Sequence, residues 1–558
     1  MFPLYASSIL ELFSREQILV FIAISILNSV LIYFSSIKFI LVLQQCGYHG
    51  KRYFKWLKNK DTPYMSRLML LCLLGFLFFC VLNTCFEALV GDNIGSYIGF
   101  IAYTLFMILY INSESSVNAK VPLKKTKRLV RLCITYCFLL TLISFALLVG
   151  LNCLSFLIGD KGVAILRFSL ICAMPILVPY ILFLAYSINQ PFEQWRKKHY
   201  VKITTQKLDK ADVIKIGITG SYAKTTTKEI LKTILSQKYR VLATSGSYNT
   251  PMGIALTAKQ LDSTHDVFIA EMGARSTGDI KELANIVKPQ IGILTGVNNQ
   301  HLETFKSIEN TKNTKFELFE NLSDNAIGFF SSDNTNSVEL FDRFNGEKYL
   351  SGMVGEENLC YATDISFSGR GMIFTLNIKG EEPISCSTIL LGRHNIGNIC
   401  LASAVAYKLG LTPYEISLGI NRIVSIGHRL ELTPNNKNII IIDDSYNSNE
   451  AGVAAAMETL DSFTGRKIVL TPGLVELGKM ENVVNLEFGK TLAKHADIVI
   501  VIGKHNAEMI INGLIDGGMA RENIKFAKTL NKGNIILNEI VNEGDVVLFE
   551  NDLPDNYN

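Results

Sequence analysis

The first third of the chain alternates long apolar stretches with short polar segments. Five apolar stretches each approach the ~20 residues that a helix needs to cross a bilayer, and they lie at about 18–43, 68–90, 94–111, 129–153 and 164–187. The pattern predicts an α-helical membrane domain of five helices over residues 1–190. The first stretch is long and lacks a small-residue cleavage site, so we do not expect a removable signal peptide.

Beyond a polar linker at 191–211, short β-rich runs alternate with helical patterns. Such alternation is typical of parallel βαβ units. It predicts two α/β domains, a central domain at 212–426 and a Rossmann-like C-terminal domain at 427–558, with the boundary near Ser425, Ile426 and Gly427. Strands are expected at 213–219, 267–274 and 291–297 and helices at 225–235 and 278–287, and a second series begins near 437.

The positive charges of the first third follow alternate apolar stretches. They are Lys51, Arg52, Lys55, Lys58, Lys60 and Arg67, then Lys120, Lys124, Lys125, Lys127, Arg128 and Arg131, and finally Arg196, Lys197 and Lys198. Because loops that remain in the cytoplasm carry an excess of Lys and Arg, these segments predict a multi-pass protein of the plasma membrane. Its N-terminus would lie outside and its C-terminal domains in the cytoplasm.

Composition separates the two parts and excludes several classes of protein. Residues 1–190 hold 16 basic and 7 acidic side chains, whereas the remainder holds 38 and 43. This asymmetry excludes a single soluble domain, a disordered chain and a bulk nucleic-acid binder. Eight of the 11 cysteines lie in the apolar third, and none of the 11 has the paired spacing of a zinc site or disulfide framework. We interpret them as small apolar residues.

The first expected strand leads into a candidate phosphate-binding loop. A strand, a loop with glycine and a Lys-Thr pair opening a helix can direct backbone N–H groups and the positive helix end at an anion. Lys224 would reach the β- and γ-phosphates, and Thr225 could ligate Mg²⁺. The strict P-loop pattern is not met, because Ile218 and Ala223 occupy its glycine positions. The expected nucleotide-binding residues here are Gly220, Ser221, Tyr222, Ala223, Lys224, Thr225 and Thr226.

With the segments that follow, the sequence resembles the Mur ligase family of ATP-dependent amide-bond ligases. The matching segments, in order, are TGSYAKT (219–225), IAEMGA (269–274), NNQHLETF (298–305), TKFELFENL (314–322), GRHNIGN (392–398), GHRLEL (427–432) and IIDDSYNSN (441–449). The amino-acid sequences of these segments are most similar to the branch of the family that adds D-alanyl-D-alanine to UDP-N-acetylmuramoyl-tripeptide. The resemblance implies that the protein binds ATP and two Mg²⁺ ions and that the reaction forms an acyl phosphate.

The resemblance also implies roles for individual residues. Lys224, His301 and Lys315 would be catalytic, and Thr225, Glu271, His301 and Lys315 would hold two Mg²⁺ ions, the last as a carbamylated lysine. Asn395 and Asn398 would face the adenine, and Arg429 and Asp444 would contact phosphate and ribose. The competing interpretations are a cationic phosphate contact for Lys315 and helix-capping or ion-pairing roles for Asn395, Asn398, Arg429 and Asp444.

Two departures from the family limit the choice of substrate. The membrane domain stands where family ligases have a soluble domain for the UDP-sugar, and the chain ends VVLFENDLPDNYN in place of a basic segment. We expect a membrane-embedded ligase that joins a carboxylate to an amino acid or small amine in cell-envelope biosynthesis. Its substrate would be a lipid-linked glycan or peptide, with no nucleic acid involved. The alternatives are a synthase of a capsular polyamide such as poly-γ-glutamate, a non-catalytic ATP-binding membrane scaffold and an ATP-driven transporter.

Overall fold

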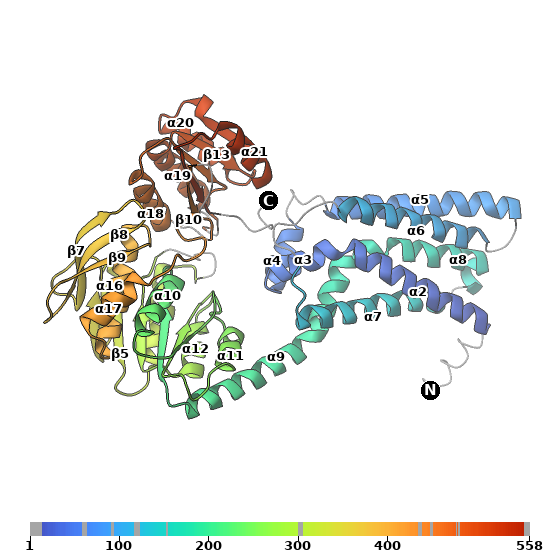
Figure 1. Ribbon diagram of the computed structural model, residues 1–558. Coiled ribbons are helices and arrows are strands. Elements are labelled where there is room, and N and C mark those ends of the chain that lie inside the picture. Colours follow the sequence, from blue (N-terminus) through green and yellow to red (C-terminus); the bar gives the residue numbers. More distant parts are fainter. Residues whose placement is uncertain are drawn as a thin grey trace. The chain divides into compact units, whose positions relative to one another are not determined.

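The computed structural model describes residues 14–58, 64–90, 94–115, 123–151, 155–298, 305–433, 438–446, 450–475, 477 and 480–551. It divides into two compact units. Unit 1 extends to Arg196 and is helical, whereas unit 2 begins at Lys197 and contains two β-sheets, each between layers of helices (Figure 1).

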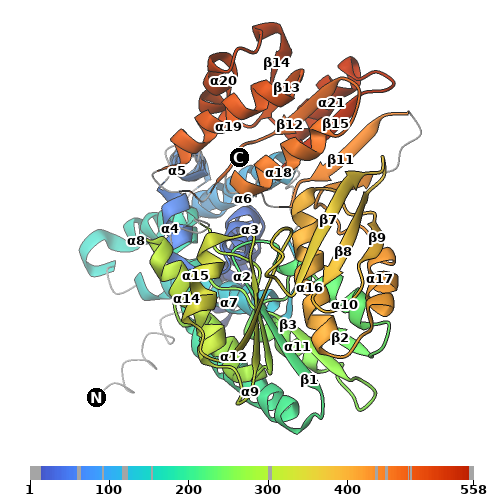
Figure 2. The same ribbon diagram turned by 90° about the vertical axis from the view of Figure 1, so that its left-hand side faces the viewer.

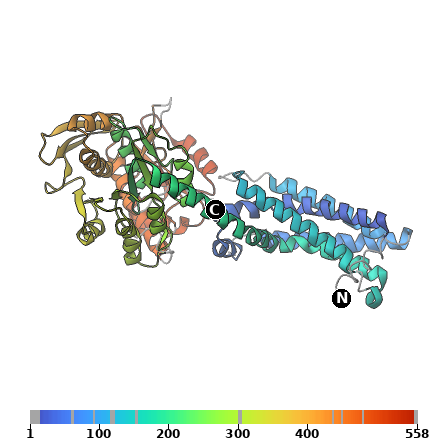
Figure 3. The same ribbon diagram turned by 90° about the horizontal axis from the view of Figure 1, so that it is seen from below.

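Unit 1 consists of helices, of which the long ones run alongside one another in two perpendicular views (Figures 1 and 3). They are α2 (Arg15–Ser35), α3 (Ile37–Gln45), α4 (Gly50–Leu57), α5 (Tyr64–Val90), α6 (Ile94–Ser115), α7 (Lys127–Gly150), α8 (Ser155–Ala173), the 3₁₀ turn η2 (Met174–Leu177) and α9 (Val178–Lys210), whose residues from Lys197 on belong to unit 2. Within the described residues, four helical stretches are long and apolar enough to cross a membrane: Arg15–Ser35, Ser66–Cys85, Lys127–Gly150 and Ile165–Lys210. Tyr97–Asn112 is a shorter apolar helix. The expected span at 94–111, and with it the total of five spans, therefore stays a prediction.

Two of the expected apolar stretches are not single helices. The first is divided at Ser36, whose N–H donates to the carbonyls of Ile32 and Tyr33 and closes the last turn of α2. The last is interrupted by η2, which contains Pro175 and so lacks one helical N–H donor. The polar segment 191–211 is helical almost throughout, because α9 continues to Lys210.

A buried polar contact joins three helices of unit 1. Asn28 of α2 is 0% exposed. Its Nδ2 donates to Ser144 Oγ of α7 at 3.1 Å, and its Oδ1 accepts from the Tyr103 hydroxyl of α6 at 3.4 Å. Side-chain hydrogen bonds between apolar helices of this kind contribute to their association in a bilayer.

The larger sheet of unit 2 has nine strands in the order β2-β3-β1-β4-β5-β6-β7-β8-β9. β1 is third in this order and is parallel to β3 on one side and to β4 on the other. The strands β7, β8 and β9 pair antiparallel at the far edge. The bounds are β1 (Ile214–Thr219), β2 (Val241–Ala243), β3 (Val267–Glu271), β4 (Ile291–Leu294), β5 (Ile327–Ser331), β6 (Glu347–Ser351), β7 (Cys360–Phe367), β8 (Met372–Ile378) and β9 (Ile384–Thr388).

Helices cover both faces of this sheet (Figure 2). One apolar core lies beneath α10 (Lys224–Leu235), α16 (Arg393–Lys408) and α17 (Pro413–Asn421). A second core lies beneath α11 (Pro251–Ala258), α12 (Asp279–Val287), α14 (Ile308–Glu320) and α15 (Thr335–Arg343). The strands between these layers are buried on both faces, as expected of a parallel sheet.

The second sheet has the strand order β10-β11-β15-β12-β13-β14, in which only the edge strand β10 pairs antiparallel. Its strands are β10 (Glu431–Thr433), β11 (Ile440–Asp444), β12 (Lys467–Thr471), β13 (Ile498–Ile502), β14 (Ile524–Ala527) and β15 (Val546–Glu550). Helices α18 (Glu450–Asp461), α19 (Glu481–His495) and α20 (Ala507–Asp516) pack on one face and α21 (Leu530–Ile540) on the other. The prediction of two α/β domains is therefore confirmed.

Candidate active site

The loop between β1 and α10 follows the predicted strand, loop and helix order. Gly220 has φ +155°, and a Cβ there would lie 2.1 Å from Thr295 Oγ1. The N–H of Ser221 donates to the Gly296 carbonyl at 2.8 Å. Only glycine therefore fits at position 220, where the loop packs against the end of β4.

Ala223 precedes α10 with φ +58° and ψ 0°, in the left-handed region. Its carbonyl accepts the hydrogen bond from Thr227 N at 2.8 Å that begins the helix. The left-handed conformation costs a non-glycine residue about 1 kcal/mol. From the sequence, alanine is less suited than glycine to this position. The structure nonetheless places Ala223 in the left-handed backbone conformation that glycine adopts most easily.

Lys224 begins α10, and its ammonium group turns back toward the loop. Nζ donates to the Gly220 carbonyl at 2.7 Å and the Ser221 carbonyl at 3.1 Å. Burial lowers the pKa of Lys224 to about 8; Glu271 opposes this effect and the positive charge of Arg429 adds to it. The lysine thus lies where an anion held by the loop would meet a positive charge.

Thr225 and Glu271 meet beside this lysine. Thr225 Oγ1 donates to Glu271 Oε2 at 2.9 Å, and Asn249 Nδ2 donates to Glu271 Oε1 at 3.2 Å. Glu271 ends β3 and is 1% exposed, while Thr226 is buried in the next position of α10. A hydroxyl and a carboxylate at the loop form an oxygen donor set that suits Mg²⁺, which binds few protein ligands and completes its shell with phosphate oxygens and water.

Lys315 lies on α14 with only 3% of its surface exposed. Its Nζ lies 5.8 Å from the centre of the Phe305 ring. Burial lowers the pKa of Lys315 to about 7; the charge of Lys224 lowers it further, whereas Asp279 and Glu317 oppose the shift. Much of the amine is therefore neutral near pH 7, which reaction with CO₂ requires.

Asn395 and Asn398 lie one turn apart on α16, and both are buried. Asn398 Nδ2 donates to Asn395 Oδ1 at 3.1 Å, and Asn395 Nδ2 donates to the Leu391 carbonyl at 2.7 Å. Thr227 Oγ1 of α10 lies 3.5 Å from Asn398 Oδ1. The pair therefore adjoins the helix of the phosphate loop, and its contact with adenine stays a prediction.

Arg429 and Asp444 belong to the C-terminal domain. The Arg429 guanidinium lies 4.5 Å from the centre of the Tyr446 ring. Asp444 Oδ1 accepts from Leu430 N at 3.2 Å, and burial raises the pKa of this carboxyl group to about 6. Their contacts with ribose and phosphate stay predictions.

His301 lies outside the described residues. Within the part of the chain that the structure does describe, no group of three His, Cys, Asp or Glu side chains is placed to hold a metal ion. The candidate metal ligands that can be located are therefore Thr225 and Glu271, which are hydrogen-bonded to each other, and Lys315, whose pKa is affected by the charge of Lys224.

Two side chains of this region were not among the predicted site residues. Lys228 and Asn249 both donate to the Glu271 carboxylate. Lys228 follows Thr225 by three positions on α10, and residues with that spacing share a helix face. This periodicity was the available signal for Lys228, whereas the loop position of Asn249 offered none.

Comparison with known proteins agrees with this geometry. Residues 218–406 match the Mur ligase middle domain, and residues 428–550 match the domain described as "Mur ligase, glutamate ligase domain". The chain therefore belongs to the Mur ligase family of ATP-dependent amide-bond ligases.

Three relatives with similar sequences share the same enzyme name. The UDP-N-acetylmuramoyl-tripeptide–D-alanyl-D-alanine ligase of Bacillus subtilis is 28% identical over 341 residues, covering 60% of this chain and 72% of that protein. The enzyme of the same name from Buchnera aphidicola is 29% identical over 311 residues, covering 56% and 67%. The Escherichia coli enzyme of the same name is 28% identical over 296 residues, which cover 52% of this chain and 65% of that protein.

Solved structures support the same fold. MurF ligase from Thermotoga maritima in complex with ADP has a TM-score of 0.58 and 25% identity, covering 64% of this chain and 80% of that one. MurF from Acinetobacter baumannii also has a TM-score of 0.58. It is 22% identical, and the match covers 65% of this chain and 78% of that one. The matched regions of the family domains lie wholly within unit 2.

Proposed function

We propose that this chain is a membrane-embedded ATP-dependent ligase that joins a carboxylate to an amine through an acyl phosphate. The observation that carries the proposal is the start of α10, where Lys224 faces the loop and Thr225 contacts Glu271. A phosphate held by this loop would meet backbone N–H groups, an ammonium group and an oxygen donor pair together.

The reaction has two steps. A carboxylate oxygen of the first substrate attacks the γ-phosphorus of ATP, the bond to the β–γ bridging oxygen breaks, and ADP leaves. The amine nitrogen then attacks the acyl carbon, phosphate leaves with the electron pair of the C–O bond, and the nitrogen loses a proton. Lys224 stabilises negative charge on the transferring phosphoryl group. Magnesium held by Thr225 and Glu271 would add charge neutralisation there.

Lys315 would serve this site as a carbamate. The neutral amine attacks CO₂ and releases a proton, which gives an anionic oxygen ligand in place of a cation. The lowered pKa of Lys315, caused first by burial, supports this role. The resulting carbamate would supply a ligand for a second Mg²⁺, together with His301.

The carboxylate substrate belongs, in our proposal, to cell-envelope biosynthesis. The relatives are named for adding D-alanyl-D-alanine to a UDP-N-acetylmuramoyl-tripeptide. In this chain a helical unit precedes the two family domains, and its four apolar helices support insertion into a membrane. A lipid-linked glycan or peptide presented at the membrane is therefore the proposed substrate, with the catalytic unit in the cytoplasm.

Two measurements on the full-length protein in nanodiscs test this function. Release of ADP and phosphate should depend on an added amine and on membrane lipid extract, and mass spectrometry should find a product heavier by the amine minus water. Lys224→Met is the matched control without phosphoryl transfer. ATP binding without amine-dependent turnover in any lipid fraction would favour the scaffold alternative.

A further inference from the structure

Lys228 is among the largest side chains that the described part of the protein buries completely, with 0% of its surface exposed. It lies on α10, four positions after Lys224 and three after Thr225. A buried lysine is costly unless its charge is paired and its donors are used. Its contacts therefore indicate why the site contains a second lysine.

Lys228 Nζ contacts three groups. It lies 3.2 Å from Glu271 Oε2 at the end of β3 and 3.3 Å from Glu229 Oε1 on its own helix. It also donates to the Gly246 carbonyl in the segment between β2 and α11. Of the two carboxylates, Glu271 is 1% exposed and Glu229 34%, so the interaction with Glu271 is the less screened by solvent.

The same segment holds Glu271 from the other side. Asn249, three residues beyond Gly246, donates to Glu271 Oε1, while Lys228 and Thr225 both reach Oε2. The carboxylate is thus fixed by a helix and a loop, and Lys228 is the group that contacts both the carboxylate and the loop.

We infer that Lys228 is a positioning residue for the metal site: it holds the Glu271 carboxylate beside Thr225 and anchors the loop that carries Asn249. Being fully buried, it acts through Glu271 and not on the nucleotide directly. This inference rests on the proposed function, in which Glu271 is a metal ligand. A lysine that merely fills space would leave metal affinity unchanged.

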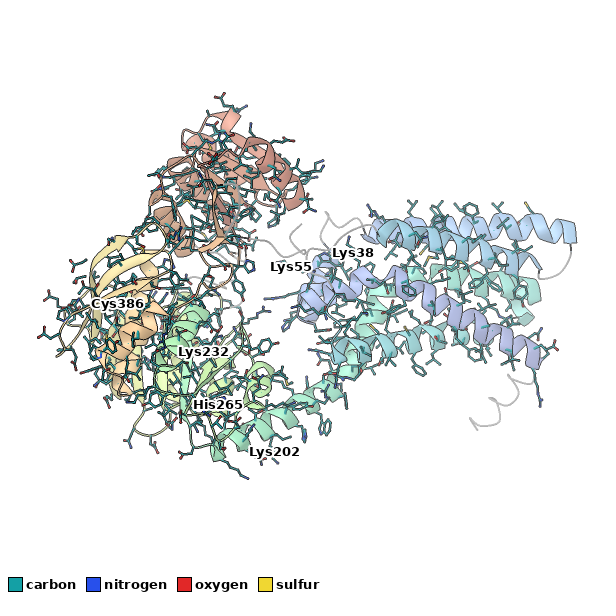
Figure 4. All side chains as sticks on the ribbon, viewed as in Figure 1. Lys38, Lys55, Lys202, Lys232, His265 and Cys386 are labelled. Atoms are coloured by element: carbon teal, nitrogen blue, oxygen red, sulfur yellow. The ribbon has the colours of Figure 1, made fainter. Side chains whose placement is uncertain are left out.

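The test compares Lys228→Met, Glu271→Gln and the double variant in full-length protein, with Lys232→Met as control. Lys232 is the exposed lysine one turn further along α10 and is labelled in Figure 4. Mn²⁺ affinity in the presence of ADP is measured by electron paramagnetic resonance, and ADP affinity is measured separately in EDTA. Neither readout depends on turnover.

We expect Lys228→Met to weaken Mn²⁺ binding about tenfold or more, as for other partners of metal ligands, with ADP affinity in EDTA nearly unchanged. In the Glu271→Gln background the same substitution should have little further effect. Equal Mn²⁺ affinity in Lys228→Met and Lys232→Met, or additive losses in the double variant, would overturn the inference.

The folding of the variants is informative as well. If Lys228→Met fails to fold but the double variant folds, the buried charges are coupled and the inference stands. If both fail to fold, Lys228 acts on the fold independently of Glu271 and the inference is rejected. Unchanged Mn²⁺ binding in Glu271→Gln would instead refute the metal-ligand role in the proposed function.

Discussion

Tyr222 and Gly296 fit so closely that a Cβ on Gly296 would lie 2.3 Å from the Tyr222 hydroxyl oxygen. Thr295 Oγ1 also donates to the Tyr222 carbonyl at 2.5 Å. Burial, and then the charge of Asp333, raises the pKa of Tyr222 to about 12, so this phenol stays neutral. The phosphate loop is therefore packed closely against the segment after β4.

The first prediction concerns Ala223. Ala223→Gly should stabilise the protein by about 1 kcal/mol, because glycine adopts φ +58° without the penalty that alanine bears. Thermal unfolding of the purified protein measures this change. The control is Ala255→Gly, inside α11, where glycine costs about 1 kcal/mol. Destabilisation by both substitutions would show that the Ala223 methyl group has a role of its own.

A second prediction concerns Lys224. Lys224→Ala should reduce ATP-dependent turnover by about 100-fold or more, because it removes the positive charge from the transferring phosphoryl group. Membrane insertion should be unaffected, which fractionation of cells can establish. Turnover close to that of the unaltered protein would exclude the phosphate-loop assignment.

The third prediction concerns Lys315. Lys315→Ala should be nearly inactive, and high bicarbonate or short carboxylic acids should partly restore it by supplying an oxygen ligand. Lys315→Arg should not be restored, because arginine remains cationic. Since the pKa of Lys315 is about 7, lowering the pH below 7 protonates the amine and should reduce activity, with bicarbonate opposing the loss.

Lys312→Ala is the matched control for this experiment. Lys312 lies one turn earlier on α14 and pairs with Glu309 and Glu339, so its loss should not create a dependence on bicarbonate. Normal activity in Lys315→Arg would instead support the cationic phosphate contact.

A fourth prediction concerns unit 1. A protein that begins at Lys197 retains the part of α9 that belongs to unit 2, where Val201 and Leu208 pack in the apolar core. It should bind ATP as the full-length protein does but lose activity on the membrane-derived carboxylate. Turnover of a soluble UDP-linked peptide at the rate of the full-length protein would contradict a lipid-side substrate.

The fifth prediction concerns the stability of the C-terminal domain. Arg466 pairs with Asp545 at 2.6 Å. Burial raises the pKa of Asp545, but hydrogen bonds from Arg466 and Asn542 outweigh it, so the pKa lies below its ordinary value. The pair therefore adds stability above the unfolded pKa of the carboxyl group, and this stability is lost as the pH falls through the folded value.

Asp545→Asn removes that contribution. Because Asp545 is buried while Arg466 is partly exposed, we expect a loss of about 1–3 kcal/mol at neutral pH and a weaker dependence of stability on acid. Chemical unfolding at pH 7 and pH 4 would measure both. An unchanged pH dependence would show that another carboxylate dominates.

Local sequence signals were sufficient for the elements around the phosphate loop. The run at 213–219 and the pattern at 225–235 correspond to β1 and α10, because apolar periodicity and a Lys-Thr start are properties of neighbouring residues. The short strand β14 was not predicted, since IKFA is too brief to show alternation.

Contacts between distant segments could not be read from the sequence in the same way. Lys228 and Glu271 are 43 positions apart, and only the parallel pairing of β1 with β3 brings them together. The φ of Ala223 also depends on packing around the loop. The helical continuation of α9 through Pro191 was hidden by its polar composition, which is typical of linkers as well as exposed helices.

The hydrogen bonds of Lys224 have a consequence for ligand affinity. Its ammonium group already donates to the carbonyls of Gly220 and Ser221. A nucleotide must compete with these internal acceptors, so each phosphate contact replaces a bond instead of adding one, and the net gain is modest. What distinguishes the phosphate from the carbonyls is its full negative charge. Nucleotide affinity should therefore fall as ionic strength rises, because salt screens that difference.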